Sequence, residues 1–352
     1  MLLWNKDRRK ICSLVEREKS IFKIVTKTKN ENFFIEKWIR HHIKILKNTK
    51  LIIFDNMSTD EYVIDIYKKY ERNIILVKFD GFMDAIHMAH LFMPLYKALS
   101  RSSIFFTIID SDEYLYLYDG NTIVSDCSVT AFLKDNQNAH FFAPCWMDNI
   151  NADENLFSFD PRNLWLFHLG KPIVNSKIIP KFEIALSKYN CPILHHTKDL
   201  PLSVHGEAPT RFLLLHLKNL NRYQRIRANM EKLVAFKIVA HRADFKNLFQ
   251  IDADLIQQGH VRAYVRETRK LAGDILDSDG QGDKNINNTF SGGRIEVLED
   301  CSLRFFPDRL EEEFKKLIAP PADYFSLIDF SADLQKSGQA TTINSYLRSV
   351  SG

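Results

Sequence analysis

The sequence predicts an α/β fold in which a mainly parallel sheet is flanked by helices, with a smaller helical region towards the C-terminal end. Apolar runs of strand length alternate with amphipathic helical segments from residue 22 to about residue 120. Acidic residues directly follow several of these runs, and after residue 218 helical spacing takes over. Strands that alternate with helices imply right-handed crossovers, which place successive strands in parallel within one sheet.

The first elements are three predicted strands that alternate with two helices. A strand over 22–28 leads to a helix over 31–46, for which Asn30 is the expected N-cap. Phe34 and Trp38 lie close to one face of that helix. The elements that follow are a strand at 51–54, a helix at 62–70 and a strand at 73–79.

The most informative stretch is IFFTIIDSDEYLYLY, residues 104–118, in which an apolar strand delivers Asp110 and Asp112 to its end. Side chains two residues apart on an extended strand point the same way, so we expect the two carboxylates to project together. Two such carboxylates repel each other and are costly to desolvate unless a cation lies between them. The D-x-D pattern therefore indicates a divalent metal, and the alternative is a strand that ends in solvated acids.

Acids gather at one predicted edge of the sheet. Asp55 and Asp80 each follow a predicted strand, and the pair Asp110 and Asp112 follows the strand that begins at residue 104. In mainly parallel sheets, ligands bind beyond the carboxyl ends of the strands. We therefore expect these carboxylates to surround a binding site.

Three segments resemble a known group of enzymes. They are KNENFFIEKWIRHH (29–42), DNMSTD (55–60) and IDSDEY (109–114). They are similar to the nucleotide-sugar half of GT-A glycosyltransferases, in the family-2-like group that carries N-E-x-x-x-x-E-W-x-x-H-H, then D-N-x-S-x-D, then D-x-D-E-F. Tyr114 stands where the group has Phe, and Lys37 separates Glu36 from Trp38.

The resemblance covers residues 22–120 and, more loosely, 140–220, and it implies a Rossmann-like GT-A fold. It implies that Asp55 contacts the nucleotide base or ribose, while Asp110 and Asp112 handle ribose and metal. The candidate nucleotide-sugar-binding residues are Asp55, Asp80, Asp110 and Lys171.

Lys171 lies in GKPIVNSK, which resembles a lysine-bearing segment of the group that is followed by a His pair and a further His. Lys171 and Lys177 could add positive charge near phosphates, and the alternative is lysines on a solvated loop. His195 and His196 stand where the group has its His pair. The alternative is an ordinary surface or core pair whose hydrogen bonds are satisfied within the protein.

The further His is His216, in the apolar run RFLLLHLKN. A late His often completes the metal shell in GT-A enzymes, so the candidate metal ligands are Asp110, Asp112 and His216. A buried, hydrogen-bonded core His is the alternative. The expected cofactor is a Mn or Mg divalent cation, and imidazole suits Mn better than Mg.

The chemistry that this arrangement would serve is displacement at an anomeric carbon. A divalent ion neutralises the departing diphosphate, and a carboxylate takes the proton from the acceptor hydroxyl. Asp148 in HFFAPCWMDN is the favoured candidate base because it follows an apolar strand that should open onto the same edge. Glu207 in VHGEAPT is the alternative base.

The sequence thus predicts a metal-dependent glycosyltransferase that moves a sugar from a nucleotide-sugar donor to a glycan or lipid-linked acceptor. The resemblance alone favours inversion, and we expect a role in bacterial surface polysaccharide synthesis. One alternative is a sugar-phosphate nucleotidyltransferase, although no Gly-rich basic phosphate loop follows the first strand. Another is a nucleic-acid-binding protein that uses the basic helix over 219–243, but interleaved acids argue against a nucleic-acid partner.

Composition is ordinary for a globular protein, with 45% hydrophobic and 26% charged residues among 352. Five scattered Cys without a C-x-x-C pair predict reduced thiols and no zinc site. No apolar run approaches the ~18 residues of a membrane span, and the first residues lack the apolar core of a signal peptide. These features predict a cytoplasmic location.

Charge is uneven along the chain. Residues 1–29 carry nine Lys and Arg against three acidic residues. Such a segment could make peripheral contact with an anionic membrane at its inner face, near a lipid-linked acceptor, and the alternative is a solvated start.

The expected domains are a nucleotide-sugar-binding catalytic domain over 1–218 and a mainly helical region over 219–352. Helical spacing continues to about residue 276, and the stretch 277–293 is rich in Gly, Asn and Asp, as in a loop or linker.

Overall fold

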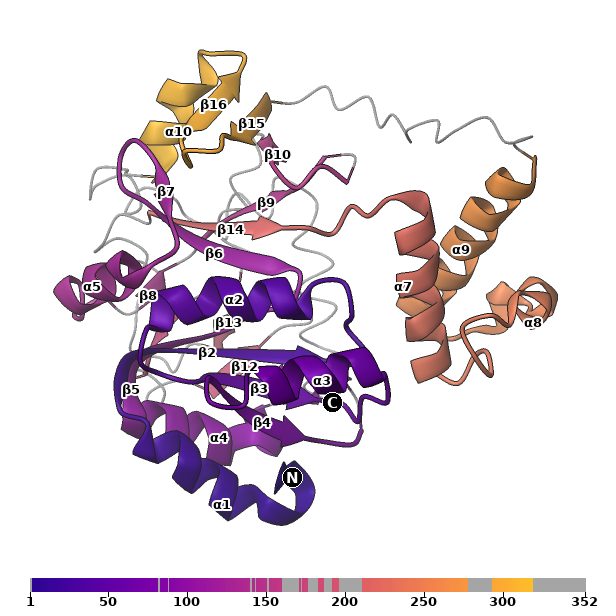
Figure 1. The fold of residues 1–352 in the computed structure, drawn as a ribbon, viewed down its shortest axis with the longest axis horizontal. Coiled ribbons are helices and arrows are strands. Elements are labelled where there is room, and N and C mark those ends of the chain that lie inside the picture. The colour runs from indigo at the N-terminus through magenta and orange to yellow at the C-terminus, as the bar shows by residue number, and fades with distance from the viewer. Residues whose placement is uncertain are drawn as a thin grey trace.

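The computed structural model describes residues 2–318 except 82, 88, 140, 143, 151, 160–170, 172, 177–182, 187–191, 196–210 and 278–292. Three parts are visible in Figure 1: a sheet between helices, a second group of strands above it, and a helical lobe to one side. The α/β fold class with a mostly parallel sheet flanked by helices is confirmed.

The main sheet has seven strands in the order β1-β4-β3-β2-β5-β11-β8. Its strands are β1 (Leu2–Leu3), β2 (Ser20–Thr28), β3 (Leu51–Asp55), β4 (Ile74–Lys78), β5 (Ser103–Ile108), β8 (Phe141–Phe142) and β11 (Ile173–Asn175). The neighbouring strands β1, β4, β3, β2 and β5 are parallel to one another, whereas β11 is antiparallel to both β5 and β8. The strands expected at 22–28, 51–54 and 73–79 are therefore confirmed.

Helices cover both faces of this sheet. They are α1 (Trp4–Arg17), α2 (Ile35–Leu46), α3 (Glu61–Lys69), α4 (Ala89–Ser102) and α5 (Cys127–Asp135), with a short 3-10 turn η1 (Met83–His87). Successive strand residues point to opposite faces, so Phe105 packs with α2 and α5 while Phe106 packs with α1 and α4. Both faces are buried, which explains the continuous apolar runs in the sequence.

The start of α2 differs from the prediction. Phe34 occupies the N-cap position of α2 without a side-chain cap. Asn30 has a positive φ of 49° and its Oδ1 accepts hydrogen bonds from the N–H groups of Thr59 and Asp60. The amide of Asn30 thus joins the loop after β2 to the loop after β3, and the N-cap prediction is wrong.

A second sheet carries the residues that follow the main sheet in sequence. Its order is β7-β6-β14-β9, with β6 (Glu113–Tyr118), β7 (Ile123–Val124), β9 (Cys145–Asp148) and β14 (Phe212–His216). Strand β14 is antiparallel to β6 and parallel to β9. The register places His216 opposite both Glu113 and Asp148.

Two histidines of α2 hold this second sheet. Nε2 of His41 lies 2.8 Å from the carbonyl oxygen of Leu115, and the N–H of Leu115 donates to Nε2 of His42 at 3.4 Å. Nδ1 of His42 in turn lies 2.9 Å from the carbonyl oxygen of Trp38. The H-H pair of the sequence motif therefore fixes the first strand of the second sheet against α2.

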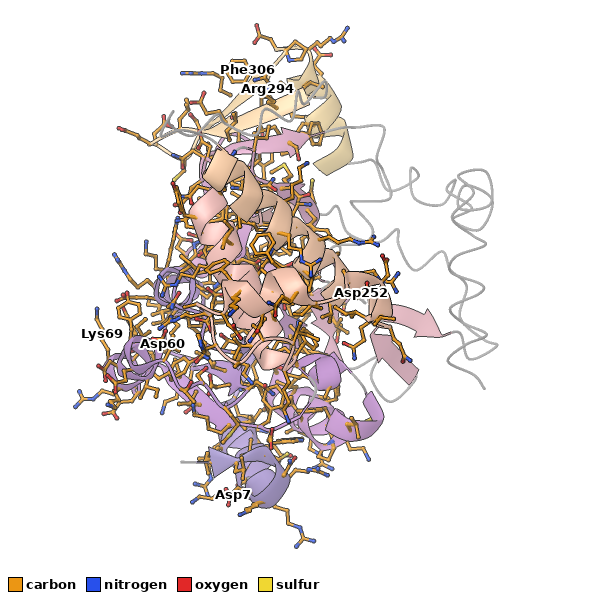
Figure 2. The ribbon with its side chains drawn as sticks, turned by 90° about the vertical axis from the view of Figure 1, so that its right-hand side faces the viewer. Asp7, Asp60, Lys69, Asp252, Arg294 and Phe306 are labelled. Atoms are coloured by element: carbon orange, nitrogen blue, oxygen red, sulfur yellow. The ribbon has the colours of Figure 1, made fainter. Side chains whose placement is uncertain are left out.

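The helical lobe contains α7 (Arg222–Ala235), α8 (Phe245–Gln250), η4 (Ala253–Leu255) and α9 (Gly259–Asp277). It has a core of its own in which Met230, Leu233, Leu248 and Val265 are buried. Figure 2 looks onto this lobe. The helices expected after residue 218 are confirmed up to Asp277, and residues 278–292 of the expected linker lie outside the described residues.

The chain then returns to the second group of strands. Strands β10 (Leu156–Phe159), β15 (Gly293–Val297) and β16 (Leu303–Phe306) form an antiparallel sheet, followed by α10 (Leu310–Ile318). Figure 2 shows Arg294 and Phe306 at the opposite end of the molecule from Asp7. The chain beyond residue 219 therefore includes strands as well as helices.

Two short strands complete the described elements, β12 (Glu183–Leu186) and β13 (Pro192–His195), which pair antiparallel. None of the helices in the described part of the chain is long and apolar enough to cross a membrane.

Candidate functional site

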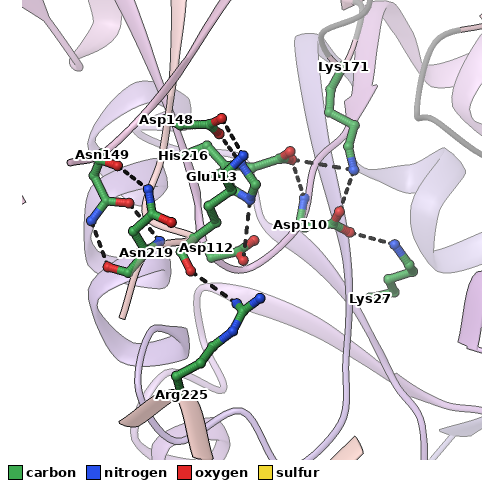
Figure 3. A network of polar contacts seen from close by, with 11 residues as sticks. Lys27, Asp110, Asp112, Glu113, Asp148, Asn149, Lys171, His216, Asn219 and Arg225 are labelled. Carbon is green, nitrogen blue, oxygen red and sulfur yellow. Dashed lines mark hydrogen bonds and ion pairs between the residues drawn. The ribbon is translucent and has the colours of Figure 1, made fainter. Parts of the chain in front are cut away.

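The strand order reverses between β2 and β5. The chain runs outward through β2, β3 and β4 and then returns to place β5 on the other side of β2. In open α/β sheets this switch point forms a crevice in which ligands bind. Lys27 at the end of β2 donates a hydrogen bond to Oδ1 of Asp110, just beyond β5, at 2.5 Å across this point (Figure 3).

Asp110 is held from two further directions. Nζ of Lys171, whose side chain is 2% exposed, lies 2.5 Å from Oδ2 of Asp110 and 3.4 Å from Oε2 of Glu113. The N–H of Asp110 donates to Oε2 of Glu113 at 2.7 Å. Burial raises the pKa of Glu113, and Lys171 offsets part of that effect. The site is therefore a compact group of two cations and two acids.

The two aspartates of the D-x-D pattern separate. Strand β5 ends at Ile108, so Asp110 and Asp112 lie in the turn that leads to β6. The argument from an extended strand, which placed both carboxylates on one side, is therefore wrong. Asp110 pairs with the lysines, whereas Asp112 faces His216 from β14.

His216 lies between two carboxylates (Figure 3). Its Nε2 is 3.4 Å from Oδ2 of Asp112, and its Nδ1 is 2.9 Å from Oδ1 of Asp148. Burial alone would lower the pKa of His216, but the two acids outweigh it and raise the pKa to about 10. The ring of Trp146 stacks on the imidazole with centroids 4.9 Å apart.

The pKa values of the two acids shift in the opposite direction, downwards. Burial would raise the pKa of Asp112, yet the adjacent His216 lowers it below its usual value. Burial likewise acts to raise the pKa of Asp148, and hydrogen bonds from His216 and Lys218 outweigh it. Both carboxylates are therefore held ionised next to a ring that carries a proton.

The donor set of Asp112 and His216 fits a divalent cation. A carboxylate and an imidazole suit Mn, and metal-binding His residues usually donate their second N–H to a carboxylate, as His216 can to Asp148. Among residues 2–318 outside the gaps, no group of three or more His, Cys, Asp or Glu side chains is arranged to hold a metal ion. A cation here would take its remaining ligands from phosphate oxygens and water, since Asp110 is engaged by Lys27 and Lys171.

Asp55 is at the expected edge but points inwards. Its carboxylate is fully buried and accepts hydrogen bonds from the N–H and hydroxyl of Ser58, from the hydroxyl of Tyr67 and from Nζ of Lys78. Asp80 follows β4 and is exposed. These four bonds fix the carboxylate of Asp55 at the start of the loop after β3, and its contact with the nucleotide stays a prediction.

Sequence reasoning did not single out Lys27, Glu31 or Lys218. Burial raises the pKa of Glu31 to about 7, and the charge of Asp112 adds to this effect. Lys218 donates a hydrogen bond to Asp148. Lys27 could have been found, because it lies within a predicted strand, 22–28, and a lysine that is buried there needs a partner.

Several candidates lie outside the described residues. These are Glu207, the alternative base, together with Lys177 and His196. His195 ends β13.

No family model and no curated protein sequence matches this chain. Solved structures similar to it include TarS 1-349 from S. aureus in complex with UDP, at 12% identity and a TM-score of 0.32, over 71% of this chain and 70% of that one. Against a longer TarS chain, the match spans 30% of that chain.

Two other solved structures are similar over different lengths. Mannosyltransferase PcManGT from Pyrobaculum calidifontis, with GDP-Man and Mn2+, is 10% identical with a TM-score of 0.31, over 76% of this chain and 77% of that one. A cytidylyltransferase from Leptospira borgpetersenii is 9% identical with a TM-score of 0.26, over 46% and 63%. These TM-scores are low, so the fold class rests on the strand order and register given above.

Proposed function

We propose that this chain is a metal-dependent glycosyltransferase that moves a sugar from a nucleotide-sugar donor to a glycan or lipid-linked acceptor. The observation that carries the proposal is the pairing of Asp112 with His216 beside the switch point of the main sheet. Switch points bind nucleotides in many α/β proteins, and a carboxylate–imidazole pair there suits a cation that accompanies a diphosphate.

The neighbouring residues have separate parts in this proposal. A divalent cation, when bound by Asp112 and His216, would neutralise the departing diphosphate. Lys27 and Lys171 hold Asp110 and add positive charge on the sheet side of the site. Asp80, which is exposed at the same edge, is a further candidate to contact the nucleotide.

Asp148 remains the proposed base, with Glu207 as the alternative. The carboxylate of Asp148 is 28% exposed and bound by His216 and Lys218. Those contacts stabilise the ionised form of Asp148. An ionised carboxylate can accept a proton, but the same stabilisation makes it a weaker base. Attack by an activated acceptor hydroxyl on the far side of the anomeric carbon would invert its configuration, which proton NMR of the product would establish.

A donor panel tests the proposed function. The full chain is heated with nucleoside diphosphates and nucleotide sugars, with and without Mn, and a stabilising pair is then assayed for release of nucleoside diphosphate. We expect one donor to raise the Tm only with Mn and to be turned over. Absence of any Mn-dependent nucleotide binding would overturn the proposal, and release of pyrophosphate from a nucleoside triphosphate would favour a nucleotidyltransferase.

Two arginines of the basic segment that the nucleic-acid alternative would use form ion pairs within the protein. Arg225 of α7 pairs with Glu267 of α9 at 3.0 Å, and Arg242 beyond α7 pairs with Glu231 at 3.1 Å. Heparin binding that disappears at modest salt while Mn-dependent nucleotide binding persists would confirm that nucleic acid is no partner.

We propose a cytoplasmic location with peripheral contact to an anionic membrane through α1. The helix buries Trp4, Ile11 and Val15 and exposes basic residues on its outer face. These exposed residues are Lys6, Arg8, Arg9, Lys10 and Arg17. Sedimentation with phosphatidylserine vesicles but not with phosphatidylcholine vesicles would support this contact, and equal sedimentation with both would contradict it.

A further inference from the structure

A pocket of about 180 Å³ opens beside the ends of β9 and β14. It is formed by the loop between β2 and α2, the loop between β9 and β10, and the segment from β14 into α7. Among the residues that line it are Phe33, Asn149, Glu154, Asn219, Asn221 and Gln224. No residue of the proposed metal site lines this pocket.

The amides of the pocket are held in fixed positions. Nδ2 of Asn149 donates to the carbonyl of Asn219 at 2.9 Å, and the N–H of Asn219 donates to Oδ1 of Asn149 at 2.8 Å. Nδ2 of Asn219 also donates to the carbonyl of Asn149. Figure 3 shows this reciprocal pair beside Asp148 and His216. Such cross-bonding ties the ends of the two strands together and keeps both amides from rotating.

A second pair of amides stands at the start of α7. Asn221 accepts from the N–H of Gln224 at 2.9 Å, and Oε1 of Gln224 accepts from the N–H of Asn221 at 3.3 Å. Within the described chain, Oδ1 of Asn219, Nδ2 of Asn221 and Nε2 of Gln224 bond to no other residue. These three lining residues therefore offer one acceptor and two donors, on side chains that other bonds already position.

An acid and an aromatic ring complete the lining. Glu154, which also lines the pocket, accepts a hydrogen bond from Lys37 at Oε2, and this leaves Oε1 as a further acceptor. Phe33 lies on the β2–α2 side, and the guanidinium of Arg227 in α7 lies over its ring at 5.1 Å from the centroid. Rings of this kind present an apolar face, while the amides and the acid bind hydroxyl groups.

The pocket adjoins the proposed reacting residues along the chain. Asn149 directly follows Asp148, and Leu217, which also lines the pocket, directly follows His216. A molecule held here lies beside the strand ends that carry the candidate base rather than at the switch point, where the nucleotide is expected. Two separate places are what a transfer between donor and acceptor requires.

We propose that this pocket binds the acceptor as a single sugar ring, with the amides and Glu154 bonded to its hydroxyl groups and Phe33 against its apolar face. Pockets for drug-sized ligands usually measure about 300 to 1,000 Å³, so the smaller volume here suits one ring. The mixture of fixed amides, one acid and one aromatic side chain matches the alternating hydroxyl and C–H surfaces of a sugar. This assignment rests on the proposed glycosyltransferase function.

Direct binding of simple sugars tests the assignment without turnover. Methyl glycosides of glucose, galactose, N-acetylglucosamine and rhamnose are offered in the millimolar range to the full chain, and saturation-transfer NMR identifies binding. We expect at least one glycoside to bind, and Gln224→Ala and Phe33→Leu each to weaken it about tenfold. The matched controls are Tyr223→Ala, exposed on the same helix, and Phe249→Leu, exposed on α8.

The outcomes separate the pocket from the proposed function. If no glycoside binds, or if the pocket variants and the controls bind a glycoside equally well, the pocket assignment is overturned even when Mn-dependent nucleotide binding is intact. Equal binding of glycerol and the glycosides would also overturn it. If glycosides bind at the pocket but no nucleotide does, the proposed function fails and the pocket remains a sugar site. A folded state for each variant is checked by its Tm.

Discussion

Nδ1 of His216 lies 2.9 Å from Oδ1 of Asp148. A proton on Nδ1 is therefore donated to Asp148, and the lone pair of Nε2 is left to face Asp112 when the ring is neutral. This arrangement suits a ring that binds a metal ion, since the second bond sets its tautomer and its orientation. Asp148 then has two candidate roles, as a base and as the residue that positions His216.

The substitution Asp148→Asn separates these roles. If Asp148 positions His216, we expect the affinity for Mn in the presence of nucleoside diphosphate to fall by about 10- to 100-fold. Electron paramagnetic resonance of free Mn measures that affinity without turnover. Loss of transfer with unchanged Mn affinity would instead assign Asp148 as the base alone.

Asp112→Asn should abolish Mn-dependent nucleotide binding and transfer, because it removes the charged ligand that faces His216. The Tm without metal should fall as well, because the change removes one of the two acids paired with His216, and it is measured to confirm that the variant is folded. Asp65→Asn, which changes a 70% exposed acid on α3, is the matched control. Transfer by Asp112→Asn that persists in EDTA would remove the metal from the proposal.

Binding of Mn should strengthen as pH rises towards 10. The pKa of His216 is raised to about 10 by its two acidic neighbours, so a cation must displace a proton from the ring below that pH. Calorimetry in buffers of different ionisation enthalpy measures the protons released. Release in the wild type and none in His216→Ala is the expected result, and equal release in both would place the cation elsewhere.

Asp55→Ala should act mainly on stability. It leaves Lys78, which is 10% exposed, without its buried partner, and breaking such a pair costs about 3 to 5 kcal/mol. Urea unfolding measures the loss. Lys78→Met should cost a similar amount, and the double variant should cost less than the sum because the two changes remove one interaction.

A nucleotide contact by Asp55 would show differently. In that case Asp55→Ala would weaken nucleoside diphosphate binding in calorimetry while Lys78→Met would not, with both measured at a temperature where each variant is folded. Equal effects of the two changes would assign the carboxylate to the fold.

Acid should destabilise the protein through its histidine pair. Burial lowers the pKa of His41 to about 4 and lowers that of His42 well below its usual value. Above about pH 6.5 the pair is neutral in both states, whereas between about 6.5 and 4 the unfolded chain binds protons that the folded chain does not. The free energy of unfolding should therefore fall as pH falls through this window.

His42→Gln should reduce the slope of that dependence, because glutamine does not titrate. The control is His241→Gln, at an exposed His after α7. Parallel curves for the wild type and His42→Gln in urea unfolding between pH 7 and pH 5 would show that the pair does not govern acid stability.

The sequence predicted the main sheet well because its signals are local. Apolar runs such as those ending at Asp55 mark strands buried on both faces, and the acids that follow them mark the carboxyl edge. The direction in which the acidic side chains point was less well predicted. Whether Asp55 points to solvent or to Lys78 depends on Tyr67 and Ser58, which lie in a helix and a loop that fold over it.

The candidate site depended on contacts between distant segments. Lys27 and Asp110 are 83 residues apart, and Asp148 and His216 are 68 apart, so no local pattern announces either pair. The turn after β5 also mattered, because it sends Asp110 and Asp112 to different partners. The register of the second sheet, which pairs His216 with Asp148, also could not be read from a local pattern.

Strand β10 finds its partner late in the chain. Phe157 pairs with Ile295, and β10 begins eight positions after Asp148, the last residue of β9. During synthesis the chain that carries Asp148 therefore emerges long before β15 can close the sheet beside it, and closing so long a loop is entropically slow. In a nascent chain stalled ahead of residue 293, the carboxyl edge of the main sheet would be formed while β10 still lacked β15 as its partner. The main sheet should therefore be complete on the ribosome before the sheet of β10, β15 and β16.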